Sequence, residues 1–349
     1  HYNFSLKPTS LYLLTNSNSQ KSFDNAYLGL IRNFKRIFWF VLLEFGQTNV
    51  VNKSFVKGRE NILNKLDEND MYLENATSLR MSDIGYQSKA QKNLKIKYNS
   101  LSEFLSKIKK AITVPFPEFE KQGLRDYDNE YQQISNGIIQ IENEYYDSIR
   151  PKRSQLKNLR PYDLLRKFGI EYVEVRGIEI SPYDISGMSL DHIQFLDLLL
   201  IYCLINTSPK ISNKEKQDID NNDSKVIYKG RSENTEISID GISIDIYSAR
   251  EEIIKDLRLV ASYLNNCDSV LESMDNVLKI EKGKIPKENF HNDGLSLAKI
   301  NTKILRTENP KYIDSIKKEA ELSLDKLSKI PKNSKAEMDE YVKNYNMQL

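Results

Sequence analysis

The sequence predicts a mixed α+β fold, and two periodic patterns support this prediction. Alternation of apolar and polar residues, which is typical of a strand with two different faces, occurs at residues 1–6, 138–146 and 170–176. Apolar residues spaced three and four apart, which is typical of one helix face, occur at 23–45 and 102–112 and in most of the chain after residue 248. We therefore expect residues 1–248 to form a sheet core with helices, and residues 249–349 to form a helical layer packed on the same domain.

Composition excludes some classes of partner. The chain has 349 residues, with 51 Lys and Arg against 49 Asp and Glu, so no basic excess indicates a nucleic-acid partner. The longest apolar run, residues 193–205, is interrupted by Asp197 and is shorter than the roughly 20 apolar residues that span a bilayer. We expect neither a nucleic-acid nor a membrane partner, and we interpret this run as a buried helix.

The cysteines and the first residues bear on the compartment. Cys203 and Cys267 are the two cysteines, a usage that fits a reducing compartment, and the start of the chain lacks the pattern of a secretory signal. Both observations favour the cytoplasm. The chain opens inside an alternating run without an initiator Met, so we expect a fragment that lacks an N-terminal segment.

Other segments carry local signals. The helix at 23–45 should end at Gly46 and bury Trp39, whereas residues 71–86 have no clean period and predict a structured loop. A helix is expected at 189–204. Residues 208–223, rich in Asn, Asp, Ser and Lys, predict a surface loop or a partly disordered insertion. The Asp-Gly pair within 238–245 predicts a hairpin.

Two of the predicted strands carry charged faces. A period of two places Tyr172, Glu174 and Arg176 on one side of the strand at 170–176. Because an isolated charge is costly to bury in an apolar strand, these side chains require ionic partners, a metal ion or a substrate. The strand at 138–146 likewise places its polar residues on one face: Gln140, Glu142, Glu144 and Tyr146.

Several cations accompany these acids in the sequence: Arg80, Arg150, Lys152 and Arg153. Carboxylates that bind Mg²⁺, together with cations that neutralise phosphoryl oxygens, are what a nucleotide site requires. An internal network of salt bridges explains the same pattern equally well. Neither GxxxxGK[ST] nor GxGxxG occurs, and scattered histidines without a CxxC pair argue against zinc.

Five blocks of sequence, in order, resemble the gammaproteobacterial type of glutamate–cysteine ligase: HYNFSL at 1–6, ATSLRMSDIGY at 76–86, QIENEYYDSIRPKR at 140–153, GIEYVEVR at 169–176 and FLDLLLIYC at 195–203. The resemblance implies the curved, mainly antiparallel sheet that this family shares with glutamine synthetase, with the active site on the sheet. Alternation alone does not establish this fold.

The resemblance also implies roles for individual residues. His1 and Glu174 match positions that coordinate Mg²⁺, with Mn²⁺ as a substitute, and Arg176 matches the catalytic arginine that contacts the transferring phosphoryl group. Positions that line the amino-acid pocket correspond to Arg80, Tyr86 and Tyr146. The cations that we expect to contact the ATP phosphates are Arg150, Lys152 and Arg153.

The implied activity is ATP-dependent ligation of the γ-carboxylate of L-glutamate to the amine of L-cysteine through γ-glutamyl phosphate, the first step of glutathione biosynthesis. We expect a monomer. One alternative is a related carboxylate–amine ligase with another acceptor, and another is an inactive interaction module that acts through its helical C-terminal layer. The family's N-terminal acidic motif has no match here, so we expect this chain alone to bind Mg²⁺ weakly and to be inactive.

Overall fold

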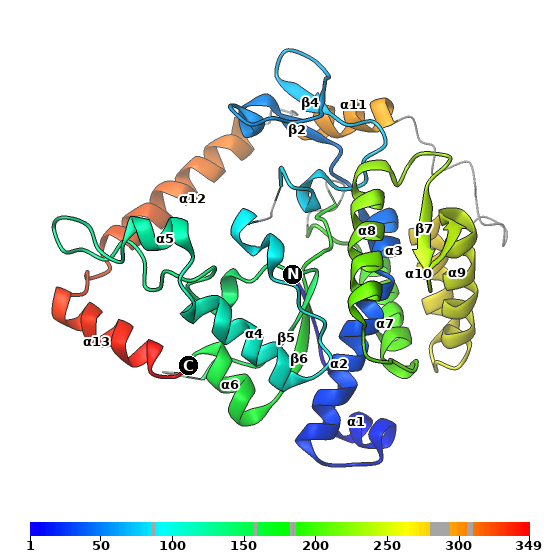
Figure 1. Cartoon of the computed structure of the whole chain (residues 1–349). Helices are drawn as coiled ribbons and strands as arrows, with labels where there is room; N and C mark the ends of the chain where they lie inside the picture. Colours follow the sequence, from blue (N-terminus) through cyan, green and yellow to red (C-terminus); the bar gives the residue numbers. More distant parts are fainter. Residues whose placement is uncertain (86–87, 157–158, 182–183, 185, 280–293, 306–309) are drawn as a thin grey trace.

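The computed structural model describes residues 1–85, 88–156, 159–181, 184, 186–279, 294–305 and 310–349 (Figure 1). Its strands are β1 (Tyr2–Phe4), β2 (Val50–Asn52), β3 (Asn64–Lys65), β4 (Asp70–Tyr72), β5 (Ile149–Lys152), β6 (Tyr172–Val175), β7 (Glu236–Ile239) and β8 (Ile242–Asp245). Its α-helices are α1 (Pro8–Thr15), α2 (Gln20–Arg36), α3 (Phe38–Phe45), α4 (Leu101–Thr113), α5 (Pro117–Gln122), α6 (Pro161–Phe168), α7 (Leu190–Ile205), α8 (Asn213–Lys229), α9 (Ile246–Ser262), α10 (Cys267–Leu278), α11 (Gly294–Leu305), α12 (Pro310–Ser328) and α13 (Lys335–Asn346).

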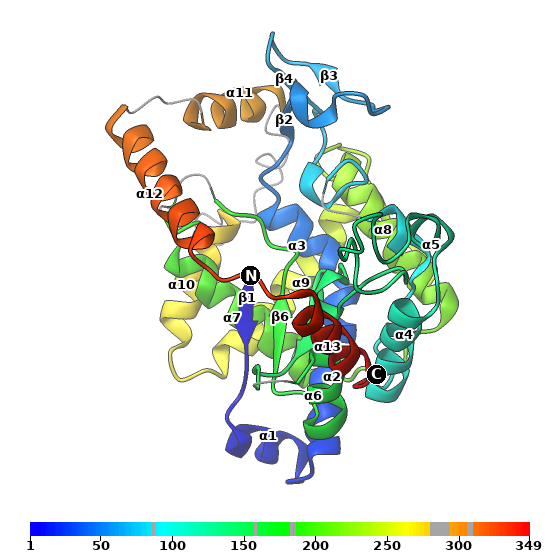
Figure 2. The same cartoon turned by 90° about the vertical axis from the view of Figure 1, so that its left-hand side faces the viewer.

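An antiparallel sheet in the order β1-β6-β5 positions the charged residues. Figure 2 shows β1 beside β6 near the middle of the molecule. The register places both Asn3 and Arg150 opposite Glu174. Val173 and Val175 alternate with the charged residues and are fully buried, as a strand with one apolar face requires. The predicted strands at 1–6 and 170–176 are thus confirmed, in shorter form.

Helices α2 and α7 pack against each other, and α2 also contacts β5 and β6. The prediction of one helix over residues 23–45 was wrong, because Ile37 leaves the helical region at φ −110° and ψ 13° and separates α2 from α3. Apolar side chains remain buried on both sides of this break, so their spacing did not reveal it. Trp39 is buried and α3 ends before Gly46, as expected.

Residues 138–146 do not form the expected strand; within them, Glu142–Glu144 form a short 3₁₀ helix. Hydrogen bonds of two glutamate side chains, one local and one to a more distant residue, contribute to the difference. The Glu144 carboxylate accepts a hydrogen bond from the backbone N–H of Gln140 at 2.7 Å, and the Glu142 carboxylate accepts one from the N–H of Tyr162 at 2.9 Å. Side chains that hydrogen-bond to backbone groups compete with strand pairing, and in this segment such hydrogen bonds form in place of a strand.

The predicted loop at 208–223 was also wrong, because most of it lies in α8. Ser212 and Glu215 form a capping box at its start, which satisfies backbone N–H groups that the first turn would otherwise leave unpaired. Ile219 and Val226 are buried, so a narrow apolar stripe anchors a helix whose other residues are polar. Polar composition misled the prediction.

Several other predicted elements are present in the structure. Helix α4 confirms the helix predicted at 102–112, and α7 confirms the one predicted at 189–204. The loop predicted at 71–86 is largely irregular over its described residues, although β4 takes its first two residues and Leu79–Met81 form a 3₁₀ helix. The Thr77 hydroxyl ties this loop to α8 by donating to the Val226 carbonyl at 2.8 Å. The β7–β8 hairpin turns at Asp240 and Gly241, both at positive φ. Helix α10 packs on α7 and α9. The described side chains of α12 are exposed along the outside of the molecule (Figures 1 and 2). The small β2-β4-β3 sheet was not predicted. None of the helices in the described ranges is long and apolar enough to cross a membrane.

Candidate active site

Basic side chains from β5, from the end of β6 and from the residue before β1 surround Glu174 on the central strand. We call Glu174, Arg150, Arg176 and His1 the Glu174 cluster. Arg150 donates to Glu174 Oε1 at 2.6 Å, and Arg176 donates to the same oxygen at 3.3 Å. His1 Nδ1 lies 3.8 Å from the other oxygen, Oε2. Burial alone would raise the pKa of Glu174, but the hydrogen bond and charge of Arg150 outweigh it and lower the pKa. The carboxylate is therefore held in its ionised form.

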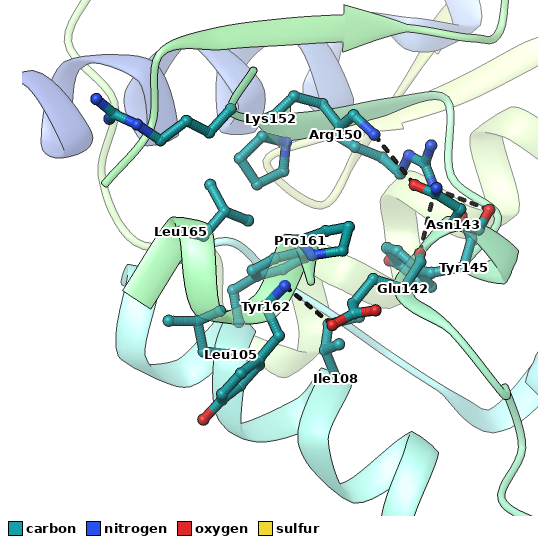
Figure 3. Close-up of a pocket in the computed structure, with 13 residues that line it drawn as sticks. Leu105, Ile108, Glu142, Asn143, Tyr145, Arg150, Lys152, Pro161, Tyr162 and Leu165 are labelled. Atoms are coloured by element: carbon teal, nitrogen blue, oxygen red, sulfur yellow. Dashed lines mark hydrogen bonds between the residues drawn. The ribbon is translucent and has the colours of Figure 1, made fainter. Parts of the chain in front are cut away.

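The side chain of Arg150 is buried, and its guanidinium binds groups inside the protein. Its Nη1 donates to the carbonyl oxygen of Tyr145 at 2.8 Å and to that of Asn143 at 3.2 Å, in the segment that was expected to be a strand. Figure 3 shows this segment wrapped around the guanidinium, with Lys152 donating to Asn143 Oδ1 at 3.1 Å. Burial, reinforced by the charge of Arg150, lowers the pKa of Lys152. A small pocket lies between these residues and α6, with Pro161 and Tyr162 on its wall (Figure 3).

Arg153 is held by the end of α6. It donates to the carbonyl oxygens of Phe168 and Gly169, the latter at 3.1 Å, and its guanidinium lies 5.4 Å from the centre of the Phe168 ring. The structure therefore brings Arg150 directly to the Glu174 cluster, whereas Arg153 binds a helix C-terminus, where cations are favourable.

A second set of predicted residues meets in a cavity of about 480 Å³, which we call the large cavity. Arg80, Tyr146 and Arg176 all line it. Arg80 donates to the carbonyl oxygens of Arg176 and Ile178 at 2.8 and 3.0 Å, so its position is coupled to the end of β6. Arg176 thus belongs to the cavity wall and to the Glu174 cluster at once. Tyr86 lies outside the described residues.

The family model for glutamate–cysteine ligase matches residues 1–226 of the chain. The chain belongs to this family. It is 38% identical over 270 residues to a glutamate–cysteine ligase of Pseudomonas entomophila, covering 76% of this chain and 51% of that relative. It is 39% identical over 273 residues to one of Saccharophagus degradans, with the same coverage. The chain therefore spans about half the length of these curated relatives.

Two solved structures resemble this member of the glutamate–cysteine ligase family. A crystal structure of glutamate–cysteine ligase from Francisella tularensis in complex with AMP superposes with a TM-score of 0.77 at 27% identity, covering 99% of this chain and 71% of that one. A bifunctional glutathione synthetase from Pasteurella multocida, at a TM-score of 0.51 and 17% identity, shares the fold over 86% of this chain and 32% of that one. The expected α+β fold with an antiparallel sheet is confirmed.

Sequence reasoning missed Glu179, a buried acid that connects three neighbouring residues and lies close to Arg80. Glu179 is buried, and its Oε2 accepts hydrogen bonds from the Thr48 hydroxyl and the Gln47 N–H, both at 2.6 Å. The Ser78 hydroxyl donates to Oε1, and Arg80 Nε lies 4.0 Å away from the same oxygen. The signal was weak, since a single acid after a strand does not reveal three distant donors and a nearby cation.

Sequence reasoning also missed a buried ion pair beneath Tyr146. Lys35 Nζ lies 2.7 Å from Asp147 Oδ1, and each side chain is 9% exposed. The hydroxyls of Tyr98 and Tyr145 donate to Asp147 Oδ2 at 2.7 and 2.8 Å. Burial opposes both charges, yet their attraction prevails, raising the pKa of Lys35 to about 12 and lowering that of Asp147 to about 2. The two residues are 112 positions apart, so no local motif links them.

Proposed function

We propose that the protein to which this chain belongs joins the γ-carboxylate of L-glutamate to the amine of L-cysteine at the expense of ATP, through a γ-glutamyl phosphate, as the first step of glutathione biosynthesis. The observation that carries the proposal is the position of Arg176, which lines the large cavity and also contacts Glu174. One guanidinium thus adjoins both the expected amino-acid pocket and the expected phosphate site. Membership of the family and the AMP complex of the Francisella tularensis relative support ATP as the co-substrate.

Arg176 is the residue that we assign to phosphoryl transfer. Negative charge spreads over the phosphoryl oxygens during the transfer, and a fixed guanidinium stabilises that charge without having to reorganise. The hydrogen bond to Glu174 Oε1 and the position at the end of β6 hold the side chain in place. Its backbone N–H donates to the Ser148 carbonyl at 2.7 Å, which ties it to the neighbouring strand.

Arg80 and Tyr146 are assigned to amino-acid binding, and Tyr86 is proposed with them. A guanidinium pairs with a carboxylate through two parallel N–H donors, and a tyrosine hydroxyl adds a further donor. One Arg80 nitrogen, Nη2, is committed to two backbone carbonyls, which orients the group along the cavity wall. The amine of the acceptor then attacks the acyl carbon of γ-glutamyl phosphate, the bond to the phosphate oxygen breaks, and inorganic phosphate leaves as the amide forms. Water must be kept from the acyl phosphate until this attack takes place.

His1 and Glu174 are proposed as ligands of Mg²⁺, with Mn²⁺ as a substitute. The Oε2 atom of Glu174 faces His1 and is not the oxygen that the two arginines bind, so an oxygen and a nitrogen donor lie together. Across the described ranges no group of three or more His, Cys, Asp or Glu is placed to hold a metal ion. The pair fits a site completed by phosphate oxygens and water, a mode that Mg²⁺ favours. Bound there, the ion neutralises phosphate charge.

Arg150, Lys152 and Arg153 were expected to contact the ATP phosphates, and the proposal now distinguishes them. Lys152 is the best placed, because it lies on β5 next to the Glu174 cluster and hydrogen bonds only one side-chain oxygen among the described residues. Arg150 is better suited to position Glu174, since its Nη2 donates to Glu174 and its Nη1 to backbone carbonyls. Arg153 is also proposed as a phosphate contact, although its Nη1 already donates to the carbonyls of Phe168 and Gly169.

We also propose that the protein acts as a monomer in the cytoplasm. Cys203 and Cys267 are both free thiols, and burial raises the pKa of Cys203, which keeps it unreactive. This usage suits a reducing compartment.

The test is phosphate release from ATP by the full-length parent protein, with glutamate and with or without cysteine. We expect turnover that requires both amino acids and yields a γ-glutamyl dipeptide identified by mass spectrometry. A panel of other amines tests for a different acceptor. ATP turnover that is indifferent to every amine would refute the proposed reaction.

A further inference from the structure

Helix α8 gives the large cavity an acidic wall. The charged residues that line the cavity are Lys35, Arg80, Asp83, Lys92, Lys95, Asp147, Arg176, Lys216, Asp220 and Asp223. Lys216, Asp220 and Asp223 come from α8, which the sequence had suggested was a polar loop. The cavity therefore presents both arginines, Arg80 and Arg176, and carboxylates, two of which come from α8.

Three of the four cavity acids already have partners. Asp83 accepts a hydrogen bond from the Tyr228 hydroxyl, Asp147 pairs with Lys35 at 2.7 Å, and Asp220 pairs with Lys216. These contacts satisfy much of their demand for positive charge and hydrogen bonds. Asp223 is the remaining acid of the cavity, and its contacts differ from those of the other three.

Asp223 is different, because its Oδ1 atom is inaccessible to solvent and accepts no hydrogen bond within the described part of the chain. Lys35 does not serve it, since that ammonium donates to Asp147 at 2.7 Å and to the Ser148 hydroxyl at 3.1 Å. A buried carboxylate oxygen without a donor costs free energy, so its retention beside a cavity calls for a ligand.

The electrostatic surroundings of Asp223 also favour a positively charged ligand. Burial raises the pKa of Asp223 to about 7 despite the lowering effect of Lys35 and Lys216, and the nearby Asp220 and Asp147 raise it further. The carboxylate is thus under-compensated by the cations that the protein provides. A positively charged ligand group would favour its ionised form.

We propose that Asp223 binds the ammonium group of an α-amino acid in the large cavity. This inference rests on the proposed function, because it assigns the ammonium end of a substrate whose carboxylate is held by the arginines of the same cavity. A cavity of about 480 Å³ falls in the range of small-molecule sites. An ammonium group brings three N–H donors to a carboxylate that has none for Oδ1. Both glutamate and cysteine carry this group.

The experiment measures binding to the full-length parent by calorimetry, using pairs of ligands that differ by the amine. Glutamate is compared with glutarate, and cysteine with 3-mercaptopropionate. In Asp223→Asn we expect affinity for one amine-bearing member to fall about tenfold or more while its amine-free analogue binds as before. The pair that changes identifies whether the donor or the acceptor amino acid occupies the site.

Asp218→Asn, on the same helix but outside the cavity lining, is the matched control and should change neither pair. Equal effects of Asp223→Asn on both members of each pair, or no effect, would overturn the inference. The readout is binding, so it is separate from the proposed reaction: absent turnover with an intact amine preference would count against the reaction alone.

A measurement on the unsubstituted protein covers the case in which Asp223→Asn does not fold. As pH falls from about 8 to about 6, Asp223 becomes protonated and the preference for the amine-bearing ligand should shrink by about tenfold. The charged groups facing it are Lys35, Lys216, Asp147 and Asp220. The ion pair between Lys35 and Asp147 raises the pKa of the lysine and lowers that of the aspartate, so neither of these two titrates in this range. A preference that does not change with pH would overturn the inference.

Discussion

Replacing Lys35 with Met should destabilise the protein through the buried carboxylate that it leaves behind. Lys35 Nζ lies 2.7 Å from Asp147, and both side chains are 9% exposed. Removing one partner of such a pair costs about 3–5 kcal/mol, because the remaining charge is buried without its counter-ion. Two tyrosine hydroxyls still donate to Asp147, at 2.7 and 2.8 Å, so we expect about 3 kcal/mol.

The pH dependence gives the same substitution a second signature. The pKa of Asp147 is lowered from 3.8 to about 2, so the pair contributes about 2 kcal/mol that is present above about pH 4 and is lost as pH falls towards 2. In Lys35→Met the lowering charge is gone and burial raises the pKa instead. The variant should therefore gain relative stability as pH falls, the reverse of the unsubstituted protein.

Urea unfolding followed by circular dichroism, across about pH 7 to about pH 3, measures both effects. Lys107→Met, on the exposed face of α4, removes the same charge without a buried partner and should change stability by less than about 0.5 kcal/mol. If Lys35→Met costs less than about 1 kcal/mol and keeps the original acid dependence, the pair does not stabilise the fold as we argue.

Three other substitutions test the site and its support. Arg176→Lys keeps the charge but loses the planar fork, so kcat of the parent should fall by about tenfold or more while KM for ATP changes little; an equal effect on both would argue against a role in transfer. Gly46→Ala places a methyl group 2.5 Å from two backbone carbonyl oxygens and should lower stability by about 1–3 kcal/mol in thermal unfolding, whereas Gly29→Ala, with 3.6 Å to its nearest neighbour, should be tolerated. Arg160→Met leaves Glu142 buried without its 2.8 Å ion pair, so we expect the free energy of unfolding in urea to fall by about 3 kcal/mol; unchanged stability would contradict the structural role.

The local patterns that predicted structure correctly were those that fix side-chain direction. The period of a strand placed Glu174 and Arg176 on one face, and their hydrogen bond at 3.3 Å confirms that placement. Alternation at the start of the chain likewise predicted β1, which pairs with β6. These predictions needed only the geometry of a single strand.

Predictions failed where contacts distant in the sequence decided the structure. Residues 138–146 alternate, but the side chains of Arg160 and Arg150, which donate to the Glu142 carboxylate and to the Tyr145 carbonyl, hold them in a turn instead of a strand. Helix α8 escaped prediction because its few apolar residues are separated by polar ones, and its burial depends on the loop at 76–85 and on the core. The roles of Glu179 and Asp223 depend on which segments meet around them, which no local pattern records.

The sequence left two interpretations of the charged strand faces, a metal and nucleotide site or an internal network of salt bridges. The register of β5 and β6 makes the two interpretations compatible, because it places Arg150 opposite Glu174. Arg150 binds only one oxygen of that carboxylate, Oε1. The other oxygen faces His1, and Arg176 extends from the same strand into the wall of the large cavity. A carboxylate that a buried arginine fixes on one side presents its remaining oxygen in one direction. The salt bridges therefore orient the side chains to which we assign catalysis and metal binding. Arg150 is therefore a positioning residue, which contributes to the proposed reaction by orienting Glu174.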